Sequence, residues 1–394
     1  MTQQFSAHDT SEERRLSSVS AIAEELAQVM QELNQSDADT EAPPPARASV
    51  MNLVLVGPDR DTIERAAEVA AQLSYTYPSR TFAVTASPAD LVASLDGYVS
   101  SYCYLSTPES KEVVCLEQVR LQATGETARH LDGIILPLLL PDLPVFLWWI
   151  GEPPEETDAL LQSCNRLIVD STGFREPLPQ LARLYRILPK QAAGPVGEHR
   201  RDGAALSDFT WLRLAPWREL LAQFFDGQET LPYLDQMSNV RVEYATDPGG
   251  AAHASPSLLL LGWLAAKLRW QYHEVTTRAG ERDYRLSFTK LSGAQVTAQV
   301  VPRARRGEPG YTGELLTVEL TALTEGLEAT FSVSLAHDGV HATTRAHLPG
   351  LRDIIRTVPL ERASMVDLLL DELGSVGSNA AFEESLAVTA RMLR

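Results

Sequence analysis

The apolar tract from Ile134 to Ile150 constrains the fold of this chain most strongly, because prolines interrupt it. Pro137, Pro141 and Pro144 each fix φ and remove a backbone donor, which disfavours a continuous helix through the tract. These interruptions, together with the charge of Asp142, also exclude a membrane-spanning helix. The sequence therefore predicts a stiff apolar turn that leads into a buried strand.

Two adjacent tryptophans, Trp148 and Trp149, follow this turn. Successive side chains of a strand point to opposite faces, so at least one of these rings requires a second layer that covers it. Truncating a buried tryptophan costs about 3–5 kcal/mol, and tryptophan is enriched at binding hot spots. The segment is therefore either an organiser of the core or an interface anchor, and the sequence leaves both interpretations open.

Between Val50 and about Arg201, predicted strands alternate with predicted helices. The strands are expected at Leu53–Val56, Thr81–Thr85, Tyr98–Leu105, Val113–Ala123, Val145–Ile150 and Leu167–Asp170. The helices are expected at Asp61–Leu73, Pro88–Leu95, Glu155–Ser163 and Pro177–Leu188. This alternation indicates an α/β N-terminal domain with a largely parallel sheet.

The pattern changes after the connector Gln191–Asp208. Further helices are expected at Trp217–Phe225, Ser255–Trp270, Arg362–Leu373 and Asn379–Leu393. Short strands separated by turn residues are expected at Val275–Arg278, Tyr284–Lys290, Gln295–Val301, Glu314–Leu320, Ala329–Ala336 and Gly339–His347. Such a meander indicates an α+β C-terminal domain with an antiparallel sheet and covering helices.

These patterns divide the chain into four parts: an N-terminal helix with an acidic, proline-containing linker at 1–48, an α/β domain at 49–200, a helical connecting region at 201–272, and an α+β domain with an antiparallel sheet at 273–394. The N-terminal helix, predicted at Thr10–Leu33, carries one apolar stripe that must be buried. The stripe packs either on its own domain or on a partner, and the sequence does not decide between them.

Charge and targeting signals exclude several classes of partner. The chain has 34 basic and 52 acidic side chains and a formal net charge of −18. This excess argues against nucleic acid and anionic membrane surfaces as partners. The N-terminal residues show no secretory signal, so the chain is expected to be cytoplasmic, with Cys103, Cys115 and Cys164 as reduced, packed thiols.

No catalytic, cofactor or metal site is expected. The turn after the first strand, at Gly57, lacks the further glycines that bring backbone close to a pyrophosphate. His337, His341 and His347 would diverge around a turn, which does not favour a metal site. No nucleophile elbow of the GxSxG type is present.

Two other motifs stand out as candidate sites. Pro78, Ser79 and Arg80 precede a strand, where the arginine can bind an anion or a carboxylate, or be solvated. Trp211, Arg213, Trp217 and Arg218 lie within eight residues of one another. Tryptophan and arginine are enriched at binding hot spots, although both are also ordinary residues at the edge of a core.

Together these motifs resemble those of the OpcA family, the glucose-6-phosphate dehydrogenase assembly proteins. The matching segments, in consistent order between about residues 50 and 270, are Val54–Val56 with Pro58-Asp59, Pro78-Ser79-Arg80, His130 with Ile135–Pro137, Leu138–Pro144 with Trp148-Trp149, Trp211-x-Arg213 with Trp217-Arg218, and Leu261–Leu268. The block of prolines and tryptophans is the most specific of them.

The resemblance implies a non-catalytic partner protein. Members of the family bind glucose-6-phosphate dehydrogenase, promote its active oligomer and act as allosteric activators in the oxidative pentose phosphate pathway. In photosynthetic members thioredoxin links this role to redox control, but here no cysteine follows Cys164, which leaves the C-terminal domain without a thiol for such control.

We expect the partner contacts at Trp211, Arg213, Trp217 and Arg218 in preference to the tryptophans of the predicted buried strand. The N-terminal helix is the second candidate for a contact surface. The alternative function is that of an α/β enzyme or ligand-binding module for a sugar phosphate, bound near Gly57 and Arg80 at the usual crevice of such sheets.

Overall fold

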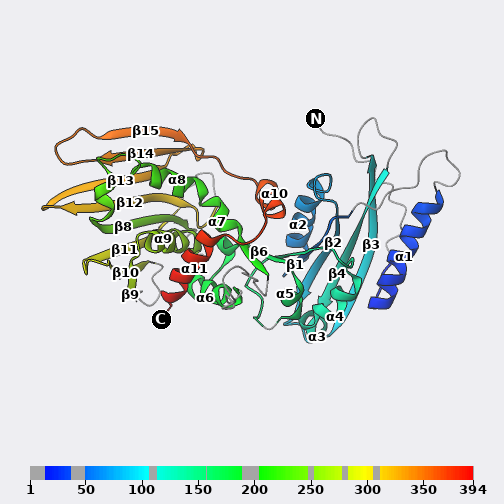
Figure 1. Ribbon diagram of the computed structural model, residues 1–394. Coiled ribbons are helices and arrows are strands. Elements are labelled where there is room, and N and C mark those ends of the chain that lie inside the picture. The colour runs from blue at the N-terminus through cyan, green and yellow to red at the C-terminus, as the bar shows by residue number, and fades with distance from the viewer. Residues whose placement is uncertain are drawn as a thin grey trace, which may run out of the picture. The chain divides into compact units, whose positions relative to one another are not determined.

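The computed structural model describes residues 14–36, 49–105, 113–156, 158–188, 204–246, 253–276, 283–304 and 311–393. The chain forms two compact units, each assembled from separate stretches of sequence (Figure 1). The first unit contains the described residues of Met1–Val169, Pro189–Leu206 and Met365–Val376. The second contains those of Asp170–Leu188, Ser207–Ser364 and Gly377–Arg394.

The first sheet is mostly parallel, as the alternation of strands and helices predicted. Among the described residues its strands have the order β3-β4-β2-β1-β5-β6-β7. Their bounds are β1 (Met51–Gly57), β2 (Ser79–Ser87), β3 (Ser94–Leu105), β4 (Val113–Thr124), β5 (Val145–Trp149), β6 (Arg166–Val169) and β7 (Ala205–Asp208). Strands β4, β2, β1, β5 and β6 pair in parallel, and β3 is antiparallel to β4.

The helices of the first unit are α1 (Val19–Ser36), α2 (Arg60–Gln72), α3 (Gly125–Arg129), α4 (Leu131–Ile135), α5 (Ala159–Ser163) and α10 (Met365–Gly374), with the 3-10 helix η1 (Leu136–Leu138). Helix α1 lies beside β3 (Figure 1). Its stripe residues Ile22 and Leu26 are buried, and Ile22 packs over Gly97 of β3. The part of the apolar stripe formed by Ile22 and Leu26 is therefore covered within its own unit. The predicted start of this helix, Thr10, lies outside the described residues.

The turn after η1 leads into the buried strand β5, as predicted, and Asn52 of β1 fixes it to the sheet. The Asn52 side chain donates to the carbonyl of Leu140 at 3.0 Å and accepts from its backbone N–H at 2.8 Å. Asp142 adopts a left-handed backbone conformation with φ of 62°. In β5, Trp148 is only 3% exposed, whereas half-buried Trp149 donates to the Glu152 carbonyl. Trp148 is thus a core residue.

The second sheet is mostly antiparallel, and its described strands have the order β15-β14-β13-β12-β8-β11-β10-β9, with only β8 and β11 pairing in parallel. The bounds are β8 (Met237–Thr246), β9 (Gln271–Thr276), β10 (Tyr284–Thr289), β11 (Gln295–Ala304), β12 (Leu315–Thr324), β13 (Leu327–Leu335), β14 (His341–His347) and β15 (Ile354–Pro359). The predicted α/β part followed by an α+β part is confirmed.

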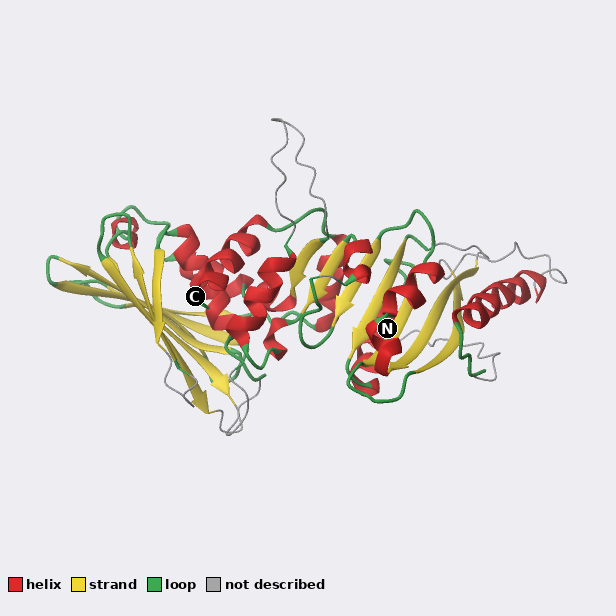
Figure 2. Cartoon of the chain, turned by 90° about the horizontal axis from the view of Figure 1, so that it is seen from below, coloured by secondary structure: helices red, strands yellow, loops and turns green. Residues whose placement is uncertain are grey.

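Helices cover one face of the second sheet (Figure 2). The helices of the second unit are α6 (Pro177–Ile187), α7 (Phe209–Arg213), α8 (Ala215–Gln223), α9 (Ser255–Lys267) and α11 (Ala380–Arg391), with the 3-10 helices η2 (Ser171–Gly173) and η3 (Leu231–Leu234). Of these, α8 contacts β13, α9 contacts β8 and β11, and η3 contacts β12, whereas α6, α7 and α11 pack on α9. Buried and half-exposed side chains alternate along β12, as expected when one face packs on helices and the other meets solvent.

Three local predictions are wrong. The helix expected at Pro88–Leu95 is absent, and the long strand β3 begins at Ser94. The region 201–272, expected to be helical, also contributes β7, β8 and β9. The cysteines are not all free thiols, because Cys115 is disulfide-bonded. The residue opposite Cys115 in the β3–β4 register is Cys103.

Candidate functional site

The tryptophans of the Trp211–Arg218 segment lie in the interior of the second unit. Trp211 of α7 is 2% exposed, and Trp217 of α8 is also buried. The ring of Trp211 packs against Phe382 of α11, with centroids 5.6 Å apart. Helix α8 begins with proline at one of its first positions, which suits a helix start because that position needs no donor. In this conformation the two tryptophans stabilise the helical layer and offer little surface to a partner.

Arg213 at the end of α7 is held by Asp170, which directly follows β6. Its two terminal nitrogens donate to the two carboxylate oxygens, each at 2.8 Å. The guanidinium also lies 5.6 Å from the ring centroid of Tyr311. Burial lowers the pKa of Arg213, but the charge and hydrogen bonds of Asp170 outweigh it and raise the pKa above its usual value. Arg213 is therefore fully engaged inside its own unit.

Asp208 is a second buried carboxylate, at the end of β7. It accepts hydrogen bonds from the backbone N–H and the hydroxyl of Ser171, at 3.0 and 2.6 Å, and from the backbone N–H of Thr210 at 2.9 Å. Burial, and then the nearby charge of Asp170, raise its pKa to about 6. Sequence reasoning missed this cluster, although Asp170 follows a strand, Asp208 ends one, and each precedes a threonine by two residues, which is typical of a helix N-cap.

Arg218 of α8 differs from the other buried arginines. Its guanidinium lies 3.6 Å from the centroid of the Trp211 ring and donates to the Trp211 carbonyl at 2.7 Å. Burial lowers its pKa to about 10. Within the part of the chain that the structure describes, no carboxylate lies within ion-pair distance of it. Among the described residues this half-buried cation therefore has no counter-ion.

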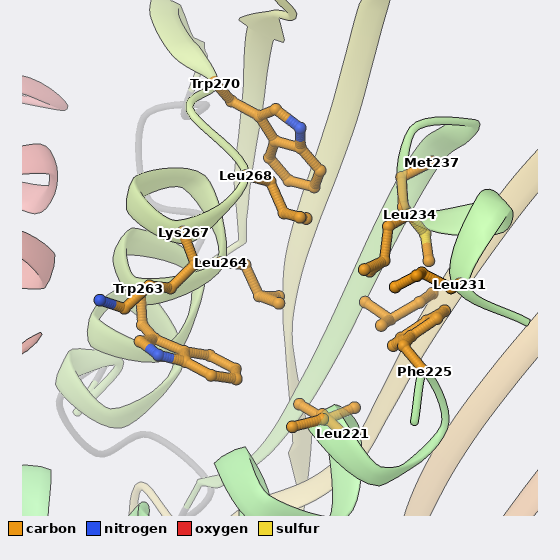
Figure 3. Close-up of a pocket in the computed structure, with 12 residues that line it drawn as sticks. Leu221, Phe225, Leu231, Leu234, Met237, Trp263, Leu264, Lys267, Leu268 and Trp270 are labelled. Carbon is orange, nitrogen blue, oxygen red and sulfur yellow. The ribbon is translucent and has the colours of Figure 1, made fainter. Parts of the chain in front are cut away.

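An apolar pocket lies next to α8 in the second unit (Figure 3). Its volume is about 280 Å³, and its lining comes from α8, η3, α9, β8 and β12. The lining residues are Leu221, Ala222, Phe225, Leu231, Leu234, Met237, Trp263, Leu264, Lys267, Leu268, Trp270 and Leu320. In Figure 3, Leu264 and Leu268 point across the pocket toward Leu231 and Leu234.

The single charged residue of this lining is already neutralised. Lys267 donates to Glu384 of α11 at 2.8 Å, and its amine points away from the pocket in Figure 3. Leu231, by contrast, is 53% exposed at the opposite wall. The pocket is therefore suited to an apolar group and has no charge of its own to offer.

The predicted anion site at Arg80 is occupied by the protein itself. Arg80 is buried and donates to the Glu117 carboxylate at 2.6 Å and to the Leu138 carbonyl at 2.5 Å. The sequence left open whether Arg80 binds an anion, binds a carboxylate or is solvated, and the structure shows that it binds a carboxylate. Ser79 bonds Thr81, and the carbonyl of Pro78 accepts from Val50, so this motif fixes the start of β2.

The turn at Gly57 likewise has an internal ligand. Asp59 caps α2 and accepts from the backbone N–H and the hydroxyl of Thr62, both at 2.9 Å. A carboxylate thus takes the position at the helix N-terminus where a bound phosphate would accept hydrogen bonds.

His341 and His347, two of the three histidines expected to diverge, contact different carboxylates. His341 contacts Asp338 and His347 contacts Asp353, each at 2.7 Å. Over the described residues, no group of three or more potential ligands is placed to hold a metal ion. Those residues also contain no helix with the length and apolarity that crossing a membrane requires.

The fold defines a class of protein with an α/β unit and an α+β unit, and comparison with known sequences identifies the family. A family model described as the glucose-6-phosphate dehydrogenase subunit N-terminal domain, OpcA type, matches residues 70–186. A model described as the C-terminal domain of the same subunit matches residues 204–386. Together they cover most of the chain, which belongs to the OpcA family.

Curated relatives agree with this assignment. The chain is 30% identical over 305 residues to the OxPP cycle protein OpcA of Nostoc punctiforme, covering 75% of this chain and 61% of that protein. It is 28% identical over 303 residues to OpcA of Synechococcus elongatus, covering 75% and 64%. The chain thus spans about three fifths of the length of the curated relatives it matches.

Among solved structures the likeness is distant. A levoglucosan dehydrogenase complexed with NADH shares 12% identity at a TM-score of 0.45, over 86% of this chain and 94% of that chain. KijD10, a 3-ketoreductase from Actinomadura kijaniata, shares 11% identity at a TM-score of 0.46, over 87% and 95%. We infer nothing about ligands or activity from likeness at this level.

Proposed function

We propose that this chain is a non-catalytic assembly factor that binds glucose-6-phosphate dehydrogenase and favours its active oligomer in the oxidative pentose phosphate pathway. The observation that carries the proposal is the match of both OpcA-type dehydrogenase-subunit models, in order, along most of the chain. The names of the curated relatives, which refer to the OxPP cycle, support the same pathway.

Activation requires that the chain bind two states of the enzyme with different affinity. An effector shifts an equilibrium only by this difference, and a coupling of about 1–3 kcal/mol changes substrate affinity roughly 5–150-fold. An interface of standard size, on the order of 1,600 Å², is enough for specific binding. The apolar pocket beside α8 supports a protein-binding role, because interfaces are anchored by apolar side chains that fill such pockets.

The proposal is tested by assaying the dehydrogenase of the same organism at several glucose 6-phosphate concentrations, with and without this chain. We expect a lower half-saturating concentration of substrate and a larger enzyme oligomer by light scattering. The heat-denatured chain is the control. Identical kinetics and identical mass in the presence of the folded chain would overturn the proposal.

A sugar-phosphate-binding role makes a different prediction. It requires the isolated chain to bind glucose 6-phosphate or NADP in titration calorimetry without the dehydrogenase. Arg80 already pairs with Glu117, and Asp59 already caps the N-terminus of α2. These internal contacts argue against binding of a sugar phosphate at either position. Tight binding by the chain alone would support the alternative.

Partner contact by Trp211, Arg213, Trp217 and Arg218 remains part of this proposal. Of the four, Arg218 is the strongest candidate for a contact, because no carboxylate in the described part of the chain pairs with it. Arg213 is already paired with Asp170.

A further inference from the structure

We propose that Arg218 and the neighbouring apolar pocket together form a docking site for an acidic, amphipathic segment of a partner polypeptide. A carboxylate of that segment pairs with the guanidinium, and an apolar side chain fills the pocket. The identity of the partner as the dehydrogenase rests on the proposed function above.

The charge of Arg218 is the first argument. Removing a cation from water is costly unless an anion compensates it, so buried charges in proteins are usually paired. Arg80, Arg166 and Arg213, which are also withdrawn from solvent, each contact a carboxylate. Arg218 instead lies over the ring of Trp211 and donates a hydrogen bond to the Trp211 carbonyl. An incoming carboxylate would supply the missing counter-charge, at a guanidinium that the Trp211 ring already holds in place.

The apolar character of the pocket is the second argument. Its walls carry no uncompensated charge, because Lys267 is paired with Glu384. A phosphate or a sugar would lose its hydration there without gaining hydrogen bonds. A leucine, methionine or aromatic side chain would instead be stabilised there by leaving water. Leu231, half exposed at the wall, would be covered by the same event.

The two features lie on one stripe of α8. Arg218, Leu221 and Ala222 follow the spacing i, i+3 and i+4, which places them on the same side of the helix, and Phe225 follows two residues after the helix ends at Gln223. At 1.5 Å per residue, the backbone of Arg218 lies about 6 Å along this axis from that of Ala222. An acidic and an apolar residue one turn apart on a partner helix have a similar spacing, as in recognition of an amphipathic helix by a groove.

The test compares the affinities of variants of the whole 394-residue chain for glucose-6-phosphate dehydrogenase. Arg218→Gln removes the cation, and Leu231→Asp places a charge at the pocket wall without emptying the core. The matched controls are Arg356→Gln on exposed β15 and Leu291→Asp in the turn after β10, a leucine that is 70% exposed. Melting temperatures confirm that each variant is folded.

We expect each site variant to bind at least about tenfold more weakly, whereas the controls bind like the parent chain. Raising the salt concentration should weaken binding by the parent chain more than binding by Arg218→Gln. If the parent binds and Leu231→Asp binds equally well, the docking site is wrong while the proposed function stands. If glucose 6-phosphate displaces the dehydrogenase from the parent but not from Arg218→Gln, the arginine binds a free phosphate and the proposal is overturned. If the parent chain does not bind the enzyme, the proposed function itself fails.

Discussion

The guanidinium of Arg166 donates a hydrogen bond of 3.0 Å to the carboxylate of Glu372, 206 positions later in the chain. A second nitrogen donates to the Ser375 carbonyl at 3.0 Å. Both charged side chains are more than nine-tenths buried. This ion pair ties α10 to β6, and so fixes a late segment of the sequence into the first unit.

Removal of one partner of this pair should destabilise the chain strongly. Glu372→Ala removes the buried carboxylate that pairs with Arg166, and we expect the free energy of unfolding to fall by about 3–5 kcal/mol in denaturant titration. Glu384→Ala breaks the exposed pair with Lys267 and should cost less than about 1 kcal/mol. Equal effects of the two substitutions would contradict the importance of burial at Arg166.

Asp208 should make stability depend on pH. Burial raises its pKa from 3.8 to about 6, so between these values the folded chain binds more protons than the unfolded chain. The contribution of this group to the free energy of unfolding therefore decreases as the pH rises from about 4 to about 6, by up to about 3 kcal/mol, and is constant above that range. Asp208→Asn should flatten this part of the profile in urea titrations at pH 4.5, 5.5 and about 7.

The control for this titration is Asp338→Asn. Backbone N–H bonds from Val340, and then the His341 side chain, lower the pKa of Asp338. Its effect on stability therefore lies below pH 4, and the profile between about pH 4 and 6 should not change. An unaltered slope in Asp208→Asn would show that this carboxyl does not titrate there.

Gly262 allows α9 and α11 to pack closely. A β-carbon at this position would lie 2.6 Å from the Ser385 carbonyl oxygen and would also overlap the hydroxyl of Thr389. We expect Gly262→Ala to lower the free energy of unfolding by about 1–3 kcal/mol. Gly133→Ala in α4 meets no atom within 4 Å and should be neutral or stabilise by up to about 1 kcal/mol. A stabilising Gly262→Ala would show that the two helices separate readily.

Cysteine reactivity should reflect one disulfide and one buried thiol. Burial raises the pKa of Cys164 to about 12, so the native chain should not react with a thiol reagent at pH 8. In denaturant without reductant, one thiol should react, because Cys115 is disulfide-bonded. After reduction all three cysteines of the sequence should react. Three reactive thiols in the unreduced, denatured chain would contradict the disulfide.

Prediction from sequence succeeded where one local signal dominates. The prolines before Val145 predicted the turn and the strand after it, and the continuous apolar run at Leu53–Val56 located β1. Prediction failed where tertiary contacts decide the structure. The central strand β8 carries alternating Val240, Val242 and Tyr244, all buried, but it lies in a part of the sequence dominated by helices. Edge strand β15 is almost entirely exposed and so has no apolar alternation to detect.

The sequence predicted which residues belong to the candidate site, but it did not predict what each of them does. The sequence marked Trp211 and Arg218 as binding anchors, and the structure shows that the ring supports the guanidinium from inside. Whether an arginine is neutralised depends on carboxylates distant in sequence, such as Asp170 for Arg213, and spacing along the chain does not reveal them. The apolar pocket is lined by residues from five elements of the fold, so no single sequence motif could have predicted it.

Because each unit contains separate stretches of the sequence, the chain cannot be divided at one point into two complete units. A break at the junction of the two family matches, near residue 204, would separate Met365–Val376 from the unit in which it packs. Either fragment would expose apolar surface that its missing piece normally shields. We therefore expect the two fragments to be poorly soluble when each is expressed alone.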